Sequence, residues 1–179
     1  MLIKVDLLKI NKISTKGFSH YAINGCQIEQ KGEDCSICAT DGRRVLLAQW
    51  HSELDKTPDF RVIIAAPILD NVLKAAHKQE LYFNGKVFSF INSTINVESL
   101  DGSFPDFEKY FLKEPGSVST IEFRPRLFYS LLKIMGDLID DSGVEFIMGN
   151  GSDSPIIIKG KTDTGIKLTG LIMPLKSKN

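Results

Sequence analysis

Apolar and polar positions follow the same succession of patterns twice in this chain. Each copy has a strand-like run, a helix-like run with an apolar stripe, and three short runs of alternating apolar and polar residues. In the first copy these segments lie at residues 61–65, 67–79, 81–83, 87–91 and 95–100. In the second copy they lie at residues 120–123, 125–135, 144–148, 156–159 and 166–173. The repetition predicts two β-α-β-β-β units.

The helix-like run of each copy begins with a proline, Pro67 or Pro125, near the first helical position, where its missing N–H costs no hydrogen bond. A helical wheel places apolar residues on one face. These residues are Ile68, Leu69, Val72, Leu73, Ala75 and Ala76 in the first run, and Leu127, Phe128, Leu131, Leu132, Ile134 and Met135 in the second. Both helices should therefore pack on a sheet through one face.

A third, degenerate copy of the pattern fills residues 1–52. Strand-like runs lie at residues 2–5, 21–29, 35–39 and 44–50, and residues 7–14 could form a short helix that Asp6 caps. However, residues 2–13 carry no clean helical stripe. The alternative is that this copy lacks its first strand.

Composition bounds the size of the core and leaves the partner open. With 179 residues, 42% of them hydrophobic, the chain can bury one sizeable core or two small ones. Lys plus Arg and Asp plus Glu number 22 each, so any surface that attracts nucleic acid must come from local arrangement of charge.

The chain also lacks the features of membrane and secreted proteins. Its longest apolar run, residues 62–69, is far too short to span a bilayer, and its first residues do not form the apolar region of a signal peptide. Three cysteines are an odd number for a disulfide framework and fit a reducing compartment. We therefore expect a soluble, cytoplasmic protein.

Three short motifs stand at the ends of strand-like runs. They are ATDGRR at residues 39–44, DGSFPDF at residues 101–107 and LIMPLK at residues 171–176. In this order they resemble the ATDGHR turn, DGRFPDY segment and VVMPMRL strand of the bacterial DNA polymerase III β-subunit sliding clamps. The resemblance covers essentially the whole chain.

The resemblance implies an α+β fold, the DNA clamp fold, in which helices of repeated β-α-β-β-β units lie on one face of antiparallel sheets. The family builds each domain from two units and closes a ring of six domains from two chains. Residues 1–112 resemble the family's middle domain, with the first unit degenerate. Residues 113–179 resemble half of its last domain.

The resemblance also implies two binding surfaces. In the family, the polar faces of the helices line the hole and meet phosphates of double-stranded DNA without reading bases. The corresponding residues here are Lys74, His77, Lys78, Arg126 and Lys133. The alternative is that these are the ordinary charges of a surface helix.

The second surface is an apolar groove between domains. In the family it receives a short peptide with a Gln-x-x-Leu-Phe-like anchor from a DNA polymerase or the clamp loader. The positions carried over are Thr40, Val45, Pro105, Tyr110, Leu171, Met173, Pro174 and Leu175, with Arg44 at the edge. Branched and thioether side chains suit such a site.

Three residues depart from the family's pattern at this groove. Arg43 replaces His, Tyr110 replaces a smaller aliphatic residue and could fill part of the groove, and Ser177 replaces Leu. Asp-Gly between strands is also a hairpin signal in its own right, and apolar residues in a last strand are typical of plain core.

Catalytic interpretations have less support. Cys35 and Cys38 form a CxxC motif, but alternation along a strand would point the two thiols to opposite faces. Asp137, Asp140 and Asp141 could serve a two-metal nuclease, although an acidic loop is the commoner meaning. We expect neither an enzyme nor a cofactor.

Two functions remain. The first is a shortened sliding clamp, a non-catalytic processivity factor that binds duplex DNA and tethers a replication or repair protein. The second is a clamp-derived peptide-binding module that does not encircle DNA. Because a lone unit would expose a sheet edge, we expect a homo-oligomer, a dimer and possibly a tetramer.

Overall fold

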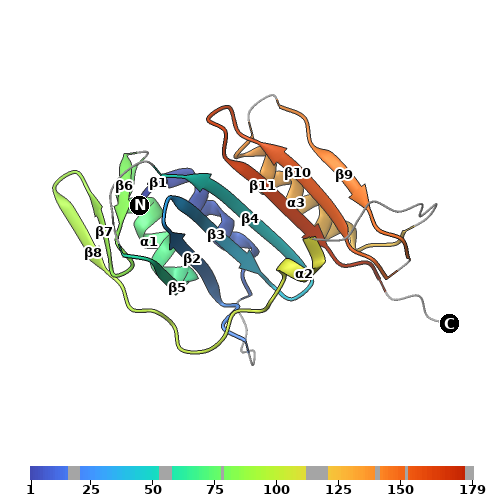
Figure 1. Ribbon diagram of the computed structural model, residues 1–179, viewed down its shortest axis with the longest axis horizontal. Helices are drawn as coiled ribbons and strands as arrows, with labels where there is room; N and C mark the ends of the chain where they lie inside the picture. Colours follow the sequence, from blue (N-terminus) through green and yellow to red (C-terminus); the bar gives the residue numbers. More distant parts are fainter. Residues whose placement is uncertain are drawn as a thin grey trace.

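The computed structural model describes residues 1–15, 21–52, 58–77, 79–111, 121–139, 142–151 and 153–175 (Figure 1). Its helices are η1 (Val5–Ile13), α1 (Ala66–Ala76), α2 (Glu108–Phe111) and α3 (Pro125–Gly136). Its strands are β1 (Leu2–Lys4), β2 (Gly25–Lys31), β3 (Asp34–Thr40), β4 (Arg44–His51), β5 (Phe60–Ala65), β6 (Glu80–Phe83), β7 (Val87–Phe90), β8 (Ser93–Asn96), β9 (Glu145–Met148), β10 (Ile156–Lys161) and β11 (Lys167–Ile172).

The strands form two antiparallel sheets. One has seven strands in the order β5-β2-β3-β4-β11-β10-β9, and the other has four in the order β1-β6-β7-β8. Counted along the chain, the first repeat holds β1–β4, the second repeat β5–β8, and the third unit α3 and β9–β11. The first two repeats exchange their first strands: β1 of the first pairs with β6 of the second, and β5 of the second pairs with β2 of the first. Each sheet therefore needs a strand from the other repeat.

The third unit joins the first through the sheet. Its last strand, β11, pairs with β4 along six residues of each strand, from Arg44↔Ile172 to Gln49↔Lys167. A Cβ on Gly170 would lie 3.0 Å from the sulfur of Met135 and 3.1 Å from Leu131, so glycine lets α3 approach β11 closely. The seven-stranded sheet thus continues from one predicted domain into the other.

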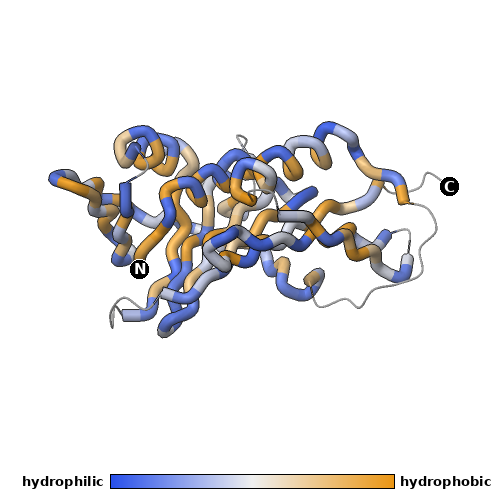
Figure 2. Tube along the Cα trace, turned by 90° about the horizontal axis from the view of Figure 1, so that it is seen from above, coloured by the Kyte–Doolittle hydropathy of each residue, from blue (hydrophilic) through white to orange (hydrophobic). Residues whose placement is uncertain are grey.

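The helices η1, α1 and α3 form a layer on one face of the sheets (Figure 2). In this layer η1 lies against α1, α3 and the strands β3 and β4. Val72 of α1 and Leu131 of α3 are fully buried, as their apolar stripes predicted. The expected α+β architecture, with helices on one face of antiparallel sheets, is confirmed.

The N-terminal segment differs from the expectation. Residues 7–14 do not form an α-helix, because Val5–Ile13 is a nine-residue 3-10 helix, and β1 precedes it, so the first strand is present. A 3-10 helix has three residues per turn instead of 3.6. The buried residues of this helix therefore do not follow an α-helical stripe.

The strand expected at residues 120–123 also differs. Thr120 lies outside the described residues, and residues 121–124 belong to no strand, although Arg124 has extended dihedral angles. The equivalent strand of the preceding repeat, β5, is held by pairing with β2. Among the residues that the structure describes, no strand pairs with segment 121–124 as β2 pairs with β5.

Candidate functional site

The helix layer presents cations at equivalent helical positions. Lys74 is the ninth residue of α1 and Lys133 the ninth of α3, and both are exposed. Each stands two residues after a fully buried side chain, Val72 or Leu131, and so on the opposite side of its helix. The pattern that buries the apolar stripe thus directs both lysines away from the sheet.

Two further predicted DNA contacts are exposed near these lysines. Arg126 lies in the first turn of α3, and His77 follows α1 in a left-handed conformation with φ of 40°. Lys78 lies outside the described residues. The sequence reading missed Lys12, which is exposed in the last turn of η1, because that segment shows no α-helical stripe.

Polar contacts fix η1 against α1 within this layer. The side-chain amide of Asn11, which is buried, donates to Asp70 Oδ1 at 2.8 Å and to the carbonyl of Ala66 at 3.3 Å. The carboxylate of Asp70 thus accepts a hydrogen bond from a neutral amide of η1. On η1, Lys9 is paired with Asp6 at 2.7 Å.

On the opposite face of the sheet lies a second apolar group, here called the outer-face cluster. It consists of buried Cys38, Val45, Leu47, Phe107 and Leu171, with half-buried Phe104, Tyr110, Phe111 and Met173 packed against them. The strands β3, β4 and β11 supply its floor, and the segment around α2 lies across it (Figure 1). Phe107 packs edge-on against Phe104 and Phe111, with ring centroids 5.9 and 5.5 Å apart.

The cluster contains four residues of the predicted groove: Val45, Tyr110, Leu171 and Met173. Tyr110, which departs from the family's pattern, is one of its half-buried members. The sequence reading missed Cys38, Leu47, Phe104, Phe107 and Phe111. For Cys38 and Leu47 a signal was available, because they alternate with core positions of β3 and β4.

The other predicted groove residues lie beside the cluster. Thr40 is buried and pairs with Val45 in the sheet, and its hydroxyl donates to the carbonyl of Arg44 at 2.8 Å. Pro105 and Pro174 are half-buried, and Leu175 is exposed. The N–H of Leu175 donates to the carbonyl of Glu122 at 2.8 Å, which holds the end of this segment.

Arg44 does not reach the outer-face cluster. Its guanidinium pairs with Asp41 Oδ2 at 3.0 Å and donates to Ser130 Oγ and to the carbonyl of Leu127, both on α3. Val45, the next residue of β4, points to the outer face. Arg44 therefore links the ATDGRR turn to the helix layer, on the other side of the sheet from the predicted groove.

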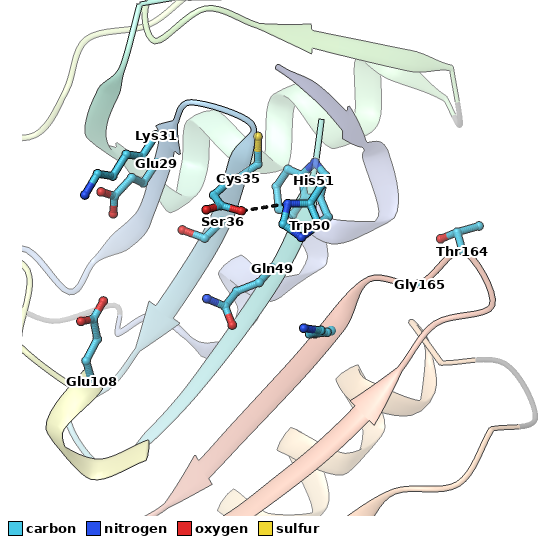
Figure 3. Close-up of a pocket in the computed structure, with 12 residues that line it drawn as sticks. Glu29, Lys31, Cys35, Ser36, Gln49, Trp50, His51, Glu108, Thr164 and Gly165 are labelled. Atoms are coloured by element: carbon cyan, nitrogen blue, oxygen red, sulfur yellow. Dashed lines mark ion pairs between the residues drawn. The ribbon is translucent and has the colours of Figure 1, made fainter. Parts of the chain in front are cut away.

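A shallow polar hollow of about 560 Å³ opens on the outer face beside α2 (Figure 3). Its lining includes Glu29, Gln49 and Lys167 from three strands, and Glu108 of α2 at one side. His51 and Asp34 pair within it at 2.8 Å. Over the described residues, no group of three or more His, Cys, Asp or Glu side chains is placed to hold a metal ion.

The cysteines lie in apolar surroundings. Cys35 belongs to the main core and Cys38 to the outer-face cluster, so the two thiols of the CxxC motif do point to opposite faces. Burial raises the pKa of the Cys26 thiol, which the nearby Asp70 raises further. Burial also raises the pKa of Cys35 and of Cys38. Buried, protonated thiols are poor nucleophiles and metal ligands.

The helices that the structure describes are too short or too polar to cross a membrane. No protein-family model and no curated protein matches the chain by sequence. Its similarity to known proteins is in its structure.

Solved structures of bacterial sliding clamps superpose on essentially the whole chain. A DNA polymerase III β subunit from Eubacterium rectale covers 100% of this chain, with a TM-score of 0.77 and 15% identity. A DNA polymerase sliding clamp from Pseudomonas aeruginosa covers 99%, with a TM-score of 0.72 and 15% identity. The DNA polymerase III β subunit of Thermotoga maritima covers 99%, with a TM-score of 0.70 and 16% identity.

The alignments extend over 66%, 66% and 65% of those three clamps, respectively, so this chain spans about two thirds of their length. The low identities show a shared fold. The chain therefore has the fold of the bacterial DNA polymerase III β-subunit sliding clamps.

Proposed function

We propose that this protein is a non-catalytic, clamp-like processivity factor of the cytoplasm. It binds double-stranded DNA without sequence preference through its helix layer, and it tethers a DNA polymerase, a clamp loader or another replication or repair protein through the outer-face cluster. The observation that carries the proposal is the equivalence of Lys74 and Lys133, which take the same position on equivalent helices of a clamp fold.

The helix layer suits a duplex because its cations are free to move toward phosphates. Lys74, Arg126 and Lys133 are exposed, and none of them forms an ion pair with another described residue. They come from helices in which apolar side chains are directed at the sheet. Contacts between such cations and phosphates are independent of base sequence and weaken with salt.

The outer-face cluster suits a peptide with an apolar anchor. Its floor of Val45 and Leu171 is buried, whereas Tyr110 and Met173 are partly accessible. A Leu or Phe side chain could pack against Met173, whose flexible thioether adapts to different shapes. Because the site is small, the expected dissociation constant is micromolar, about −8 kcal/mol.

The first experiment measures duplex binding of the whole chain by fluorescence anisotropy. With about three phosphate contacts per chain, log K should fall with a slope of about −3 against log salt, or about 40-fold from about 50 to 200 mM. No binding in low salt, or binding that salt does not weaken, would contradict the DNA part of the proposal.

The second candidate function is a peptide-binding module that encircles nothing. The observation that favours it is that the outer-face cluster is formed within one chain, whereas the described residues of the helix layer include few exposed cations. In the same assay, a labelled peptide ending in a Gln-x-x-Leu-Phe-like anchor would bind while the duplex would not.

A further inference from the structure

The core of the seven-stranded sheet is left open at β9. One row of paired residues faces the helix layer and crosses every strand: Ile64, Cys26, Ala39, Leu46, Gly170, Ile158 and Phe146. The first six are buried, but Phe146 at the end of the row is 44% exposed. Phe146 is thus partly exposed to water although it faces the core, because β9 is the last described strand of the sheet.

A neighbouring row shows the same change. Ile172, Ile156 and Met148 are paired across β11, β10 and β9, and their exposed fractions are 0%, 2% and 39%. Two core-facing side chains on one edge strand are therefore uncovered. Among the described residues, β9 is the last strand of this sheet.

The first two repeats show what covers such an edge. There, β2 is the counterpart of β9, and β5 of the sister repeat pairs with it from Gly25↔Ala65 to Gln30↔Phe60. The sister repeat receives a strand in return, because β1 pairs with β6. The two helices of these repeats, η1 and α1, also pack against each other.

The helix of the third unit has the corresponding face uncovered. Leu69, the fourth residue of α1, is fully buried, but Phe128, the fourth of α3, is only half-buried. Asp70, the fifth residue of α1, is bonded to η1 through Asn11. At the fifth position of α3 stands Tyr129, which is 67% exposed.

Aromatic contacts connect this face to the segment before α3. The ring of Phe128 lies 4.6 Å from that of Phe123 and 5.9 Å from that of Phe146, centroid to centroid. Residues 121–124, Ile-Glu-Phe-Arg, alternate apolar and polar side chains as an exchanged strand would. In the third unit, segment 121–124 immediately precedes α3 as β5 precedes α1.

We propose that β9 and α3 form a self-association surface, occupied by a second copy of this chain. A two-fold axis would place residues 121–124 of each copy along β9 of the other and would bring Tyr129 of each copy against the partner's α3. The third unit has both an open edge and a segment of matching length that belongs to no strand, and a two-fold contact with a second copy satisfies both at once. This copies the reciprocal exchange of β1 and β5.

Pairing of β9 with a second copy would also reduce the risk of aggregation through this edge strand. An exposed strand with apolar side chains can pair with unrelated strands, and a specific partner prevents this. The proposal does not depend on the peptide site, because β10 separates β9 from β11, the nearest strand of the outer-face cluster. Because α3 also carries Arg126 and Lys133, the oligomeric state is measured without DNA.

The test is the oligomeric state of the full chain, measured by size-exclusion chromatography with light scattering at about 50 µM. The wild type should have twice the monomer mass of 19.9 kDa. The double variant Phe146→Lys with Met148→Lys should be monomeric, with dimerisation weakened at least about tenfold, because it puts unpaired charges in the contact. The matched control is Ile91→Lys, which adds a lysine at an exposed apolar residue after β7.

A second variant and a second measurement locate the contact. Tyr129→Arg changes only an exposed helical residue and should also give a monomer, even if the double variant does not fold. Amide hydrogen exchange at residues 121–123 and 145–148 should slow as the concentration of wild-type protein rises. A wild-type monomer, a dimer that both the double variant and Tyr129→Arg leave intact, or protection at β8 instead would overturn the proposal.

Discussion

The guanidinium of Arg44 and the carboxylate of Asp41 lie 3.0 Å apart, and both side chains are largely enclosed, with 11% and 18% of their surface exposed. Asp41 Oδ1 also accepts the N–H groups of Arg43 and Arg44, at 3.0 and 3.1 Å. The guanidinium of Arg44 also donates hydrogen bonds to Ser130 Oγ and to the carbonyl of Leu127, both on α3. The pair therefore connects the first repeat to the third unit.

Arg44→Ala should destabilise the protein by about 2 kcal/mol, because it leaves the Asp41 carboxylate enclosed without its cation and removes the contact with α3. Urea unfolding measures the change. Arg43→Ala is the matched control, since Arg43 is the exposed neighbour, and its effect should stay within about 0.5 kcal/mol. Equal stabilities of the two variants would show that the pair does not hold the units together.

The buried thiols make stability depend on pH in the alkaline range. Because burial raises the pKa of Cys26, Cys35 and Cys38, the folded chain keeps these protons when the unfolded chain loses them, near about pH 8.5. Their contribution to stability is complete below that pH and is lost as the pH rises above it. Cys38→Val should reduce the loss of stability between about pH 8 and 10.

The same thiols should react with a disulfide reagent only after unfolding. At about pH 8, native protein should show little reaction over a time in which denatured protein shows three reactive thiols. Rapid reaction of a thiol in the native protein would contradict the assignment of these cysteines to the core and to the outer-face cluster.

Much of the fold could be predicted because local patterns and packing agree. Val72 and Leu131 lie in apolar stripes of ordinary α-helices, and both are fully buried. The nine residues of η1 follow a different helical period, so an α-helical wheel could not find them. The sequence also could not show that β11 pairs with β4, because that pairing joins segments far apart in the chain.

The candidate groove was predicted in part for a similar reason. Motif residues Val45 and Met173 meet in the outer-face cluster, but Phe107 and Phe111 join them from a segment whose path over the sheet has no local signal. The role expected for Arg44 depended on which face of β4 it occupies. Its neighbour Val45 points outward, and so alternation places the arginine on the helix side.

Met173→Ala should weaken binding of the anchor peptide about tenfold, because it removes a flexible, partly accessible apolar side chain that packs against the buried residues of the outer-face cluster. Calorimetry with the Gln-x-x-Leu-Phe-like peptide measures this change. Met148→Ala, on β9 and outside the outer-face cluster, removes the same side chain and should leave the affinity unchanged. If both variants bind like the wild type, the cluster is not the peptide site.

Lys74→Glu combined with Lys133→Glu should nearly abolish duplex binding, because it reverses the charge at equivalent positions of both helices. The matched control is Lys159→Glu with Lys161→Glu, which makes the same change in net charge at two exposed residues of β10. Those lysines alternate with Ile158, whose side chain faces the helix layer, so they lie on the outer face of the sheet. Fluorescence anisotropy should therefore show nearly normal affinity for the control and almost none for the first variant. Equal losses in both would mean that net charge, and not the helix layer, governs binding, whereas wild-type affinity in the first variant would remove the helix layer as the DNA-binding surface.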